Sequence, residues 1–142
     1  MWADFVAMIP GEPGNHTMGQ LNWERAIDPA HPLDCILAVD ADGRAHGFTL
    51  YLAFPFTWST GDVCYLQDIY VRETARGTGL GRALLAEVMT DAADWEASFL
   101  TLMLDRSNES ARAFYARHGF AARGDYDTLI LEGPGLDDLM NR

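Results

Sequence analysis

The sequence predicts an α/β protein with a mixed central sheet and helices on both of its faces. Two apolar runs, Cys35–Val39 and Gly47–Phe54, flank the turn-forming segment Asp40–Gly43, and this arrangement is typical of a β-hairpin. Further along, strand-like and helix-like segments alternate, and strands that are joined through a helix run parallel. An antiparallel hairpin followed by strand–helix units therefore gives a mixed sheet.

The other elements are predicted from apolar spacing and from the residues that interrupt each run. Apolar residues recur at every fourth position from Leu80 to Ala92, which indicates one face of a long helix. Pro10 and Pro29 end the two preceding helices. Helices are expected over Trp2–Ile9, Gln20–Ile27 and Leu80–Trp95, and a further helix is capped by Ser107 or Asn108 and ended by Gly119. Besides the hairpin, strands are expected over Asp62–Val71, Phe99–Leu104, Phe120–Arg123 and Tyr126–Leu131.

The composition is that of a globular protein with one domain, covering residues 1–142. Hydrophobic residues make up 49% of the 142 positions, which suffices for a buried core. No apolar run approaches the roughly 20 residues that a membrane-spanning helix needs, so no membrane partner is expected. The segment after Met1 lacks the basic start of a secretory signal, and a cytoplasmic location is expected.

The charge balance argues against a nucleic-acid partner. The net charge is −11, and the 10 Lys and Arg residues are thinly spread, whereas nucleic-acid binders present a basic face. The acidic surface either attracts cationic substrates or only keeps the protein in solution. The four histidines lack the spacing of metal ligands, so no metal is expected.

The strongest local pattern is a glycine-rich turn, Arg76–Gly81, which follows a strand and opens a helix. Glycines let a ligand approach the backbone closely, and the first N–H groups of a helix have no partner within it. These donors and the helix dipole suit a diphosphate. Arg82 stands where the dinucleotide fingerprint needs glycine, and the ATP-type loop is absent. Taken alone, the turn fits a phosphate site and an ordinary helix start equally well.

A second motif lies downstream, where Asn108, Ala111 and Tyr115 form the pattern Asn-x-x-Ala-x-x-x-Tyr ahead of Gly119-Phe120. Together the two motifs resemble the GCN5-related N-acetyltransferase (GNAT) superfamily, whose cofactor turn has the form Arg/Gln-x-x-Gly-x-Gly/Ala. The resemblance covers about residues 33–131. Within the superfamily, Tyr65–Val71 is similar to the corresponding segment of diamine acetyltransferases and of yeast histone/polyamine acetyltransferases.

This resemblance implies the acyl-CoA N-acyltransferase (GNAT) fold and acetyl-CoA as co-substrate. The diphosphate would lie on the glycine turn, the pantetheine arm would pair with the backbone of Ile69–Val71, and Tyr115 would protonate the leaving thiolate. For Asn108 a plain helix cap remains the alternative, and for Tyr115 a core position beside Phe114. The implied cofactor-binding residues are Ile69, Tyr70, Val71, Arg76, Gly77, Thr78, Gly79, Leu80, Gly81, Arg82, Asn108 and Tyr115.

The base that takes the amine proton is not fixed by the resemblance. At pH 7 only about one alkyl amine in 2,500 is neutral, and diamine acetyltransferases carry a glutamate at the position of Gln67, whose amide is no base. Strand alternation predicts that Asp68 points to the opposite face from Gln67. A water chain to Asp68 or Glu73, or a less basic amine, stays open. The predicted substrate-binding residues are Gln67, Asp68 and Trp58, the last either lining a pocket or only packing.

The predicted function is acetyl-CoA-dependent N-acetylation of a primary amine, namely a small amine, a polyamine or an amino acid. Two alternatives are a protein acetyltransferase acting on lysines or N-termini, and a non-catalytic sensor of acyl-CoA, which Gln67 favours. The relatives often dimerise, so a homodimer stays open. The opening strand of the family has no counterpart here. Either the natural start lies upstream of Met1, or dimer contacts compensate.

Overall fold

The structure is a computed structural model that describes residues 1–6, 16–97, 99–124, 128, 129, 131 and 140. Its residues fall into two compact units, Met1–Met103 and Leu104–Arg142, and each unit is described by itself. The single domain over residues 1–142 stays a prediction. Among the described residues, no helix has the length and apolar character that crossing a membrane requires.

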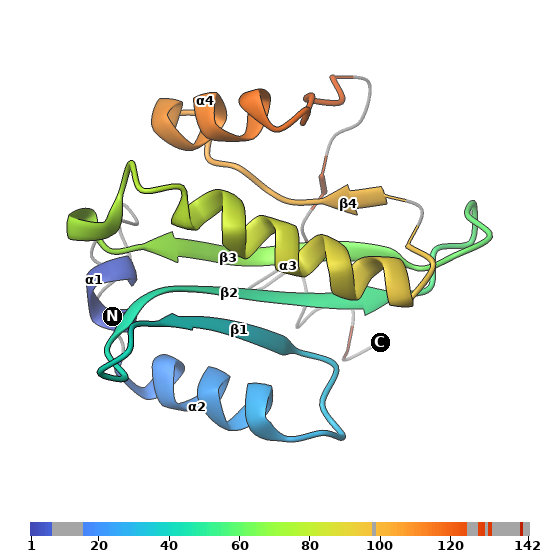
Figure 1. The fold of residues 1–142 in the computed structure, drawn as a ribbon. Helices are drawn as coiled ribbons and strands as arrows, with labels where there is room; N and C mark the ends of the chain where they lie inside the picture. The colour runs from blue at the N-terminus through green and yellow to red at the C-terminus, as the bar shows by residue number, and fades with distance from the viewer. Residues whose placement is uncertain (7–15, 98, 125–127, 130, 132–139, 141–142) are drawn as a thin grey trace. The chain divides into compact units, whose positions relative to one another are not determined.

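The first unit is built on a four-stranded mixed sheet in the order β1-β2-β3-β4 (Figure 1). The hairpin prediction is confirmed, because β1 and β2 pair antiparallel around a turn in which Gly43 has a φ of 78°. β3 pairs antiparallel with β2 and parallel with β4, which confirms the mixed sheet. The strands are β1 (Asp34–Val39), β2 (Ala45–Phe54), β3 (Val63–Val71) and β4 (Phe99–Thr101).

Helices cover both faces of this sheet, as predicted. α3 (Leu80–Asp94) lies on one face (Figure 1), with its Leu84, Val88 and Ala92 buried. Gly47 on β2 permits this close approach, because an added Cβ would lie 3.1 Å from the Leu84 side chain and 2.8 Å from the main-chain oxygen of Tyr70. The stripe predicted from Leu80 to Ala92 is therefore the face that packs on the sheet.

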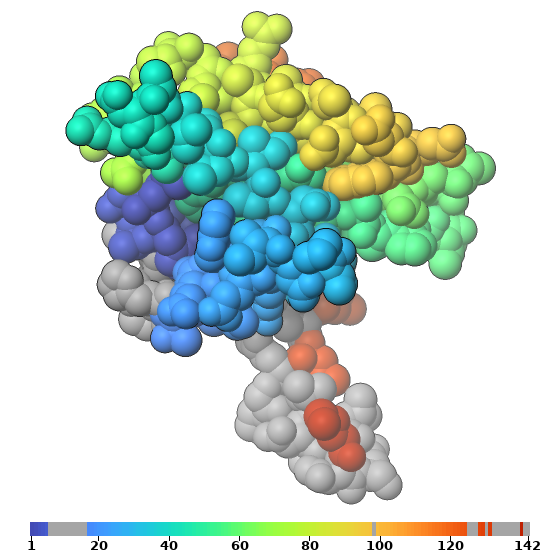
Figure 2. Space-filling view, turned by 60° about the horizontal axis from the view of Figure 1, so that its bottom comes forward, coloured from blue at the N-terminus to red at the C-terminus, as the bar shows by residue number. Residues whose placement is uncertain are grey.

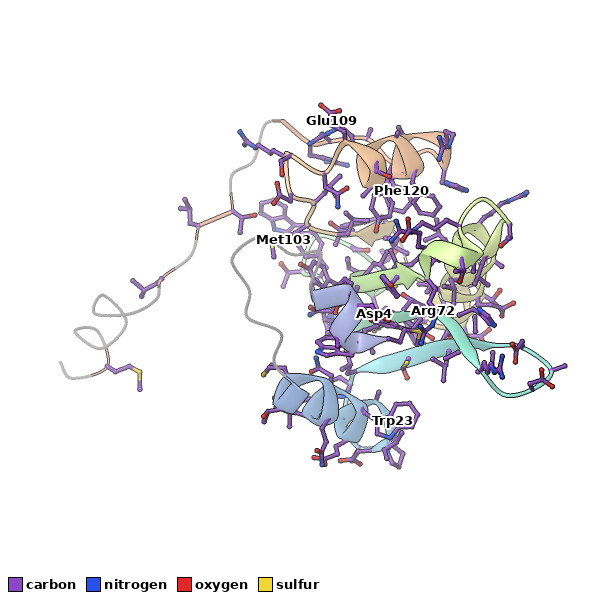
Figure 3. All side chains as sticks on the ribbon, turned by 90° about the vertical axis from the view of Figure 1, so that its left-hand side faces the viewer. Asp4, Trp23, Arg72, Met103, Glu109 and Phe120 are labelled. Carbon is purple, nitrogen blue, oxygen red and sulfur yellow. The ribbon has the colours of Figure 1, made fainter. Side chains whose placement is uncertain are left out.

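The opposite face carries α1 (Trp2–Val6) and α2 (His16–Ile27), with α2 lying across β1 in Figure 2. The rings of Trp2 and Phe5 pack on Phe48, with centroids 5.9 and 5.6 Å away, and Phe5 also contacts Tyr70. Arg72, just beyond β3, donates to Asp4 at 3.4 Å, and the two lie side by side in Figure 3. These contacts fix α1 against the sheet.

The pairing of β2 with β3 contains one irregularity. Leu50 faces Asp68, but the next residue, Tyr51, faces Leu66, so that Gln67 is an extra residue on β3. This is the arrangement of a β-bulge, which leaves a backbone group of the bulged strand short of a partner. The fully buried Thr49 compensates, because its hydroxyl donates to the main-chain oxygen of Asp68 at 2.9 Å.

The second unit contains α4 (Glu109–Arg117), and Figure 3 labels the first residue of this helix. Asn108 caps it, because its Oδ1 accepts the N–H of Ala111 at 3.0 Å. Gly119, with a φ of 87°, follows the helix end as predicted. Tyr115 is 9% exposed, and its ring lies 5.3 Å from that of Phe114 and 5.2 Å from that of Phe120.

Some predicted boundaries and one predicted strand need correction. α2 begins at His16 rather than Gln20, and β4 ends at Thr101 rather than Leu104. Phe120–Arg123 is not a strand, and its two alanines have low strand propensity. Most of the strand predicted over Tyr126–Leu131, and Ile9 of the first helix, lie outside the described residues.

Candidate active site

The glycine-rich turn lies between the end of β3 and the start of α3. After Val71 the chain forms a short 3₁₀ helix, η1 (Glu73–Ala75), and then two left-handed glycines. Gly77 has a φ of 77° and Gly79 a φ of 90°, values that residues with a Cβ rarely adopt. The Thr78 hydroxyl donates to the Ala75 main-chain oxygen at 2.7 Å and braces the turn.

This turn has the properties of a cradle for a diphosphate. Gly79 is the N-cap residue of α3 and has no side chain with which to cap the helix, so the first N–H groups, from Leu80 onward, have no acceptor inside it. Among the described residues, no atom lies within 4 Å of the position that a Cβ would take at Gly77 or Gly79. The space in front of the turn is therefore open, and the residues present fit an anionic phosphate group.

β4 pairs along its whole length, but only with the first three residues of β3. The pairs run from Val63 with Phe99 to Tyr65 with Thr101, whereas β3 continues to Val71 (Figure 1). The later half of β3, including the segment Ile69–Val71, thus lacks β4 as a neighbour and leads directly into the glycine turn. An extended ligand can pair with such a strand edge through its amide groups. The side chain of Tyr70 is buried in the core, so this residue offers a ligand its backbone.

A cavity of about 220 Å³ opens on the sheet face that carries α2. β3 and β2 form its floor, and α2 with the loop that follows forms its wall. The residues that give it chemical character are Asn22, Arg25, His31, Leu50, Gln67 and Asp68.

Both Gln67 and Asp68 line this cavity, which corrects the prediction that Asp68 points to the opposite face. Regular alternation would separate two successive residues, but the bulge interrupts the alternation here. The sequence expectation failed because it assumed an unbroken strand.

Asp68 is a carboxyl with altered acidity. Burial raises the pKa of Asp68 from 3.8 to about 6. A carboxylate with such a pKa is largely ionised at pH 7 and accepts a proton more readily than an ordinary aspartate does. Asp68 therefore has the chemistry of a general base facing a cavity.

The other predicted site residues have different surroundings. Trp58, on the loop between β2 and β3, is 83% exposed, contacts the ring of Phe56, and is not among the residues lining the cavity. Asn108 and Tyr115 belong to the second unit. There Asn108 makes the helix cap that was its alternative role, and Tyr115 packs beside Phe114 as its alternative role requires. Both assignments to the acetyl-CoA site remain predictions.

The cavity wall was missed by sequence reasoning. The helix carrying Asn22 and Arg25 was predicted, but nothing in its sequence indicated which polar residues face the sheet. His31 lies in the loop before β1, and the sequence around it carries no pattern that would place it in a cavity. Among the described residues, no group of three or more His, Cys, Asp or Glu side chains is arranged to hold a metal ion.

Comparison with known proteins defines the class of this fold and site. The chain matches the acetyltransferase (GNAT) family over residues 2–120 and belongs to that family. It resembles an integron cassette protein from the mobile metagenome of V. cholerae, with a TM-score of 0.84 over 99% of this chain and 88% of that one. Their sequence identity of 22% shows a shared fold alone.

Two relatives with named activities are similar in sequence. A D-amino-acid N-acetyltransferase from Saccharomyces cerevisiae is 35% identical over 96 residues, which cover 67% of this chain and 60% of that protein. A mycothiol acetyltransferase from Paenarthrobacter aurescens is 30% identical over 123 residues, which cover 87% of this chain and 37% of that protein. The chain thus spans less than two thirds of the length of either relative.

Proposed function

We propose that this protein is an acetyl-CoA-dependent N-acetyltransferase that acts on the primary amine of a small molecule. The observation that carries the proposal is the glycine turn. Two left-handed glycines with open space before them present the first amides of α3, directly after the stretch of β3 that β4 leaves unpaired. Membership of the acetyltransferase (GNAT) family supports the same conclusion.

In this proposal, the backbone amides of Gly77–Arg82 bind the diphosphate of acetyl-CoA. The Arg76 side chain is already fixed beside the turn, because its Nε donates to the main-chain oxygen of Val71 at 3.2 Å. The pantetheine arm extends along Ile69–Val71 and pairs with the backbone there. A strand rises about 3.3 Å per residue, so an arm that follows β3 backward brings its thioester end toward Gln67 and Asp68.

Asp68 then acts as the base. Its carboxylate removes a proton from the substrate ammonium, directly or through one water, and the neutral nitrogen attacks the thioester carbonyl. The C–N bond forms, the C–S bond breaks, the thiolate of coenzyme A leaves, and the nitrogen releases its second proton to solvent to give the neutral amide. The raised pKa of Asp68 supports this role, because a base with a pKa near 6 receives the proton more easily than one near 4.

Tyr115 is the proposed acid, and this assignment rests on the sequence motif. Its phenol would give a proton to the departing thiolate. Asn108 would donate to the pantetheine arm, a role that its cap leaves open, because the cap engages only Oδ1.

The class of acceptor is proposed from the relatives. The two relatives named above are a D-amino-acid N-acetyltransferase and a mycothiol acetyltransferase, so small amines are the first acceptors to try. A cavity of about 220 Å³ beside Asp68 suits an acceptor of that size.

A turnover assay tests the proposal. Acetyl-CoA is mixed with amino acids, short alkyl amines, polyamines and a lysine-containing peptide, and the released thiol is measured together with the acetylated product. We expect turnover with at least one small amine. Turnover with the peptide alone would favour a protein acetyltransferase, and tight acetyl-CoA binding without any turnover would favour a sensor.

A further inference from the structure

The polar residues that line the cavity beside Asp68 fall into two groups, which are called its donor end and its acceptor end. α2 and the loop after it contribute hydrogen-bond donors, whereas β3 contributes the Asp68 carboxylate and the Gln67 amide. A primary amine needs only the acceptor end. The donors of the other end can therefore bind a second group of the same substrate, one that accepts hydrogen bonds.

Arg25 dominates the donor end. Its side chain is half-buried, and its Nη1 donates to Oδ1 of Asn22 at 3.4 Å. Within the described part of the chain, the ion pairs formed by arginine involve Arg72 and not Arg25. Among the described residues no carboxylate forms an ion pair with Arg25, so its guanidinium can bind an anionic group of a ligand in the cavity.

Two further donors accompany this guanidinium. The Nδ1 of His31 accepts the N–H of Leu33 at 3.2 Å, so a neutral His31 carries its proton on Nε2. Because Oδ1 of Asn22 is engaged by Arg25, the amide NH₂ of Asn22 is the group that this side chain can offer to a ligand. Arginine binds carboxylates through paired N–H donors, and neighbouring neutral donors strengthen such binding.

From this polarity we infer that the acceptor is an amino acid, whose carboxylate is held by Arg25 and whose ammonium group faces Asp68. The inference rests on the proposed acetyltransferase function and narrows its substrate class. It excludes polyamines as good substrates, because they would place a second positive charge against Arg25.

An adjoining apolar cavity indicates the kind of side chain. It has a volume of about 250 Å³ and shares Asn22 and Leu50 with the first cavity. Its wall includes Trp23, Leu37 and Phe48. A substrate bound between Arg25 and Asp68 can extend an apolar side chain into this space, where removing apolar surface from water favours binding. The inferred acceptor is thus an amino acid with an apolar side chain.

Leucine and its decarboxylated analogue, 3-methylbutylamine, test the inference. They share the amine and the branched chain and differ in the carboxylate alone. We expect kcat/KM for D- or L-leucine to exceed that for 3-methylbutylamine and for spermidine by about tenfold or more, since losing a charge-assisted pair costs at least that factor.

Variants at Arg25 assign the carboxylate site. Arg25→Gln lowers the leucine to 3-methylbutylamine ratio of kcat/KM about tenfold, mainly by raising KM for leucine, and Arg25→Lys recovers part of the loss. Arg44→Gln is the matched control, because Arg44 is exposed on the β1–β2 turn, and it leaves the ratio unchanged. Calorimetry of leucine with the protein saturated by coenzyme A provides a readout without turnover.

The outcomes separate the two proposals. Equal use of 3-methylbutylamine and leucine, or an Arg25→Gln variant with the wild-type ratio, overturns the amino-acid inference and leaves the acetyltransferase proposal intact. If leucine binds in a way that depends on Arg25 but no amine is turned over, the result contradicts the acetyltransferase proposal instead. Absence of both binding and turnover of leucine also contradicts the inference.

Discussion

Gln67 and Asp68 are neighbours in the sequence and yet line the same cavity, because β3 bulges between the pairs Leu50–Asp68 and Tyr51–Leu66. Asp68 lies on the α2 side by regular alternation, because it pairs with Leu50 and lies two residues before Tyr70, which packs on that side, and the bulge brings Gln67 to the same side. Burial there raises the pKa of Asp68 to about 6. Regular pairing with β2 thus positions the proposed base, and burial sets its acidity.

Replacing the proposed base changes the pH dependence of catalysis. In the wild-type protein kcat/KM falls as pH drops below about 6, because Asp68 becomes protonated and no longer accepts a proton. Asp68→Asn removes this limb and lowers kcat/KM at pH 7.5 by about 100-fold. Stopped-flow or steady-state assays between pH 5 and 9 measure both effects.

Two further variants serve as controls for the Asp68→Asn experiment. Asp42→Asn changes an exposed aspartate in the hairpin turn and should keep the wild-type profile. Adding Gln67→Glu to Asp68→Asn places a carboxyl back in the same cavity and should restore part of the activity together with an acid limb. An Asp68→Asn profile identical to that of the wild type would remove Asp68 from the mechanism.

The same carboxyl should make folding stability depend on pH. Because the pKa of Asp68 is higher in the folded state than in the unfolded chain, the folded state holds the proton more tightly between about pH 4 and 6. Its contribution to stability is present below pH 4 and is lost as pH rises through 6. Asp68→Asn should therefore be more stable than the wild type at pH 7, by on the order of 1–3 kcal/mol.

Urea unfolding at pH 4 and pH 7 measures this difference. The gain of the Asp68→Asn variant should be large at pH 7 and small at pH 4. An equal gain at both values would mean that side-chain packing, and not ionisation, causes it.

The glycine turn offers a matched pair of substitutions. Gly79→Ala puts a Cβ into the open space before α3 and should raise the Kd for acetyl-CoA about tenfold or more. Gly43→Ala introduces the same backbone strain, because Gly43 has a φ of 78° and equally open surroundings in the hairpin turn. Each variant should lose about 1 kcal/mol of stability, but Gly43→Ala should keep the wild-type Kd. Equal effects on acetyl-CoA binding would show that the turn is structural only.

A second pair of substitutions tests the proposed role of Tyr115, with Tyr51 as the comparison. Tyr115→Phe should lower kcat about 100-fold with little change in stability, if its phenol protonates the thiolate. Tyr51→Phe removes the hydrogen bond from the buried Tyr51 hydroxyl to Asp91 on α3 and should cost about 1 kcal/mol of stability without a change in kcat. An unaltered kcat for Tyr115→Phe would leave that residue with its packing role beside Phe114.

The sequence predicted what depends on local patterns. The hairpin around Gly43, the stripe from Leu80 to Ala92 and the glycine turn each have a signature within a few residues, and all are present. The cavity had no such signature. It brings together Arg25 from α2 and Asp68 from β3 in one lining, and a single extra residue on β3 adds Gln67 to it. Register irregularities of this kind depend on pairing between distant strands and are not visible in alternation alone.

The end of β4 was predicted wrongly for a related reason. Leu102 and Leu104 are apolar enough to extend β4, but parallel pairing with β3 stops at Thr101. Apolar character predicts burial, whereas strand assignment needs a partner.

Binding of acetyl-CoA is the step on which every proposed role depends, and isothermal titration calorimetry measures it directly. We predict one saturable site per chain with a Kd below about 100 µM, and a matching rise in thermal stability. No detectable heat at millimolar acetyl-CoA, from protein whose circular dichroism shows it to be folded, would contradict the assignment of the glycine turn.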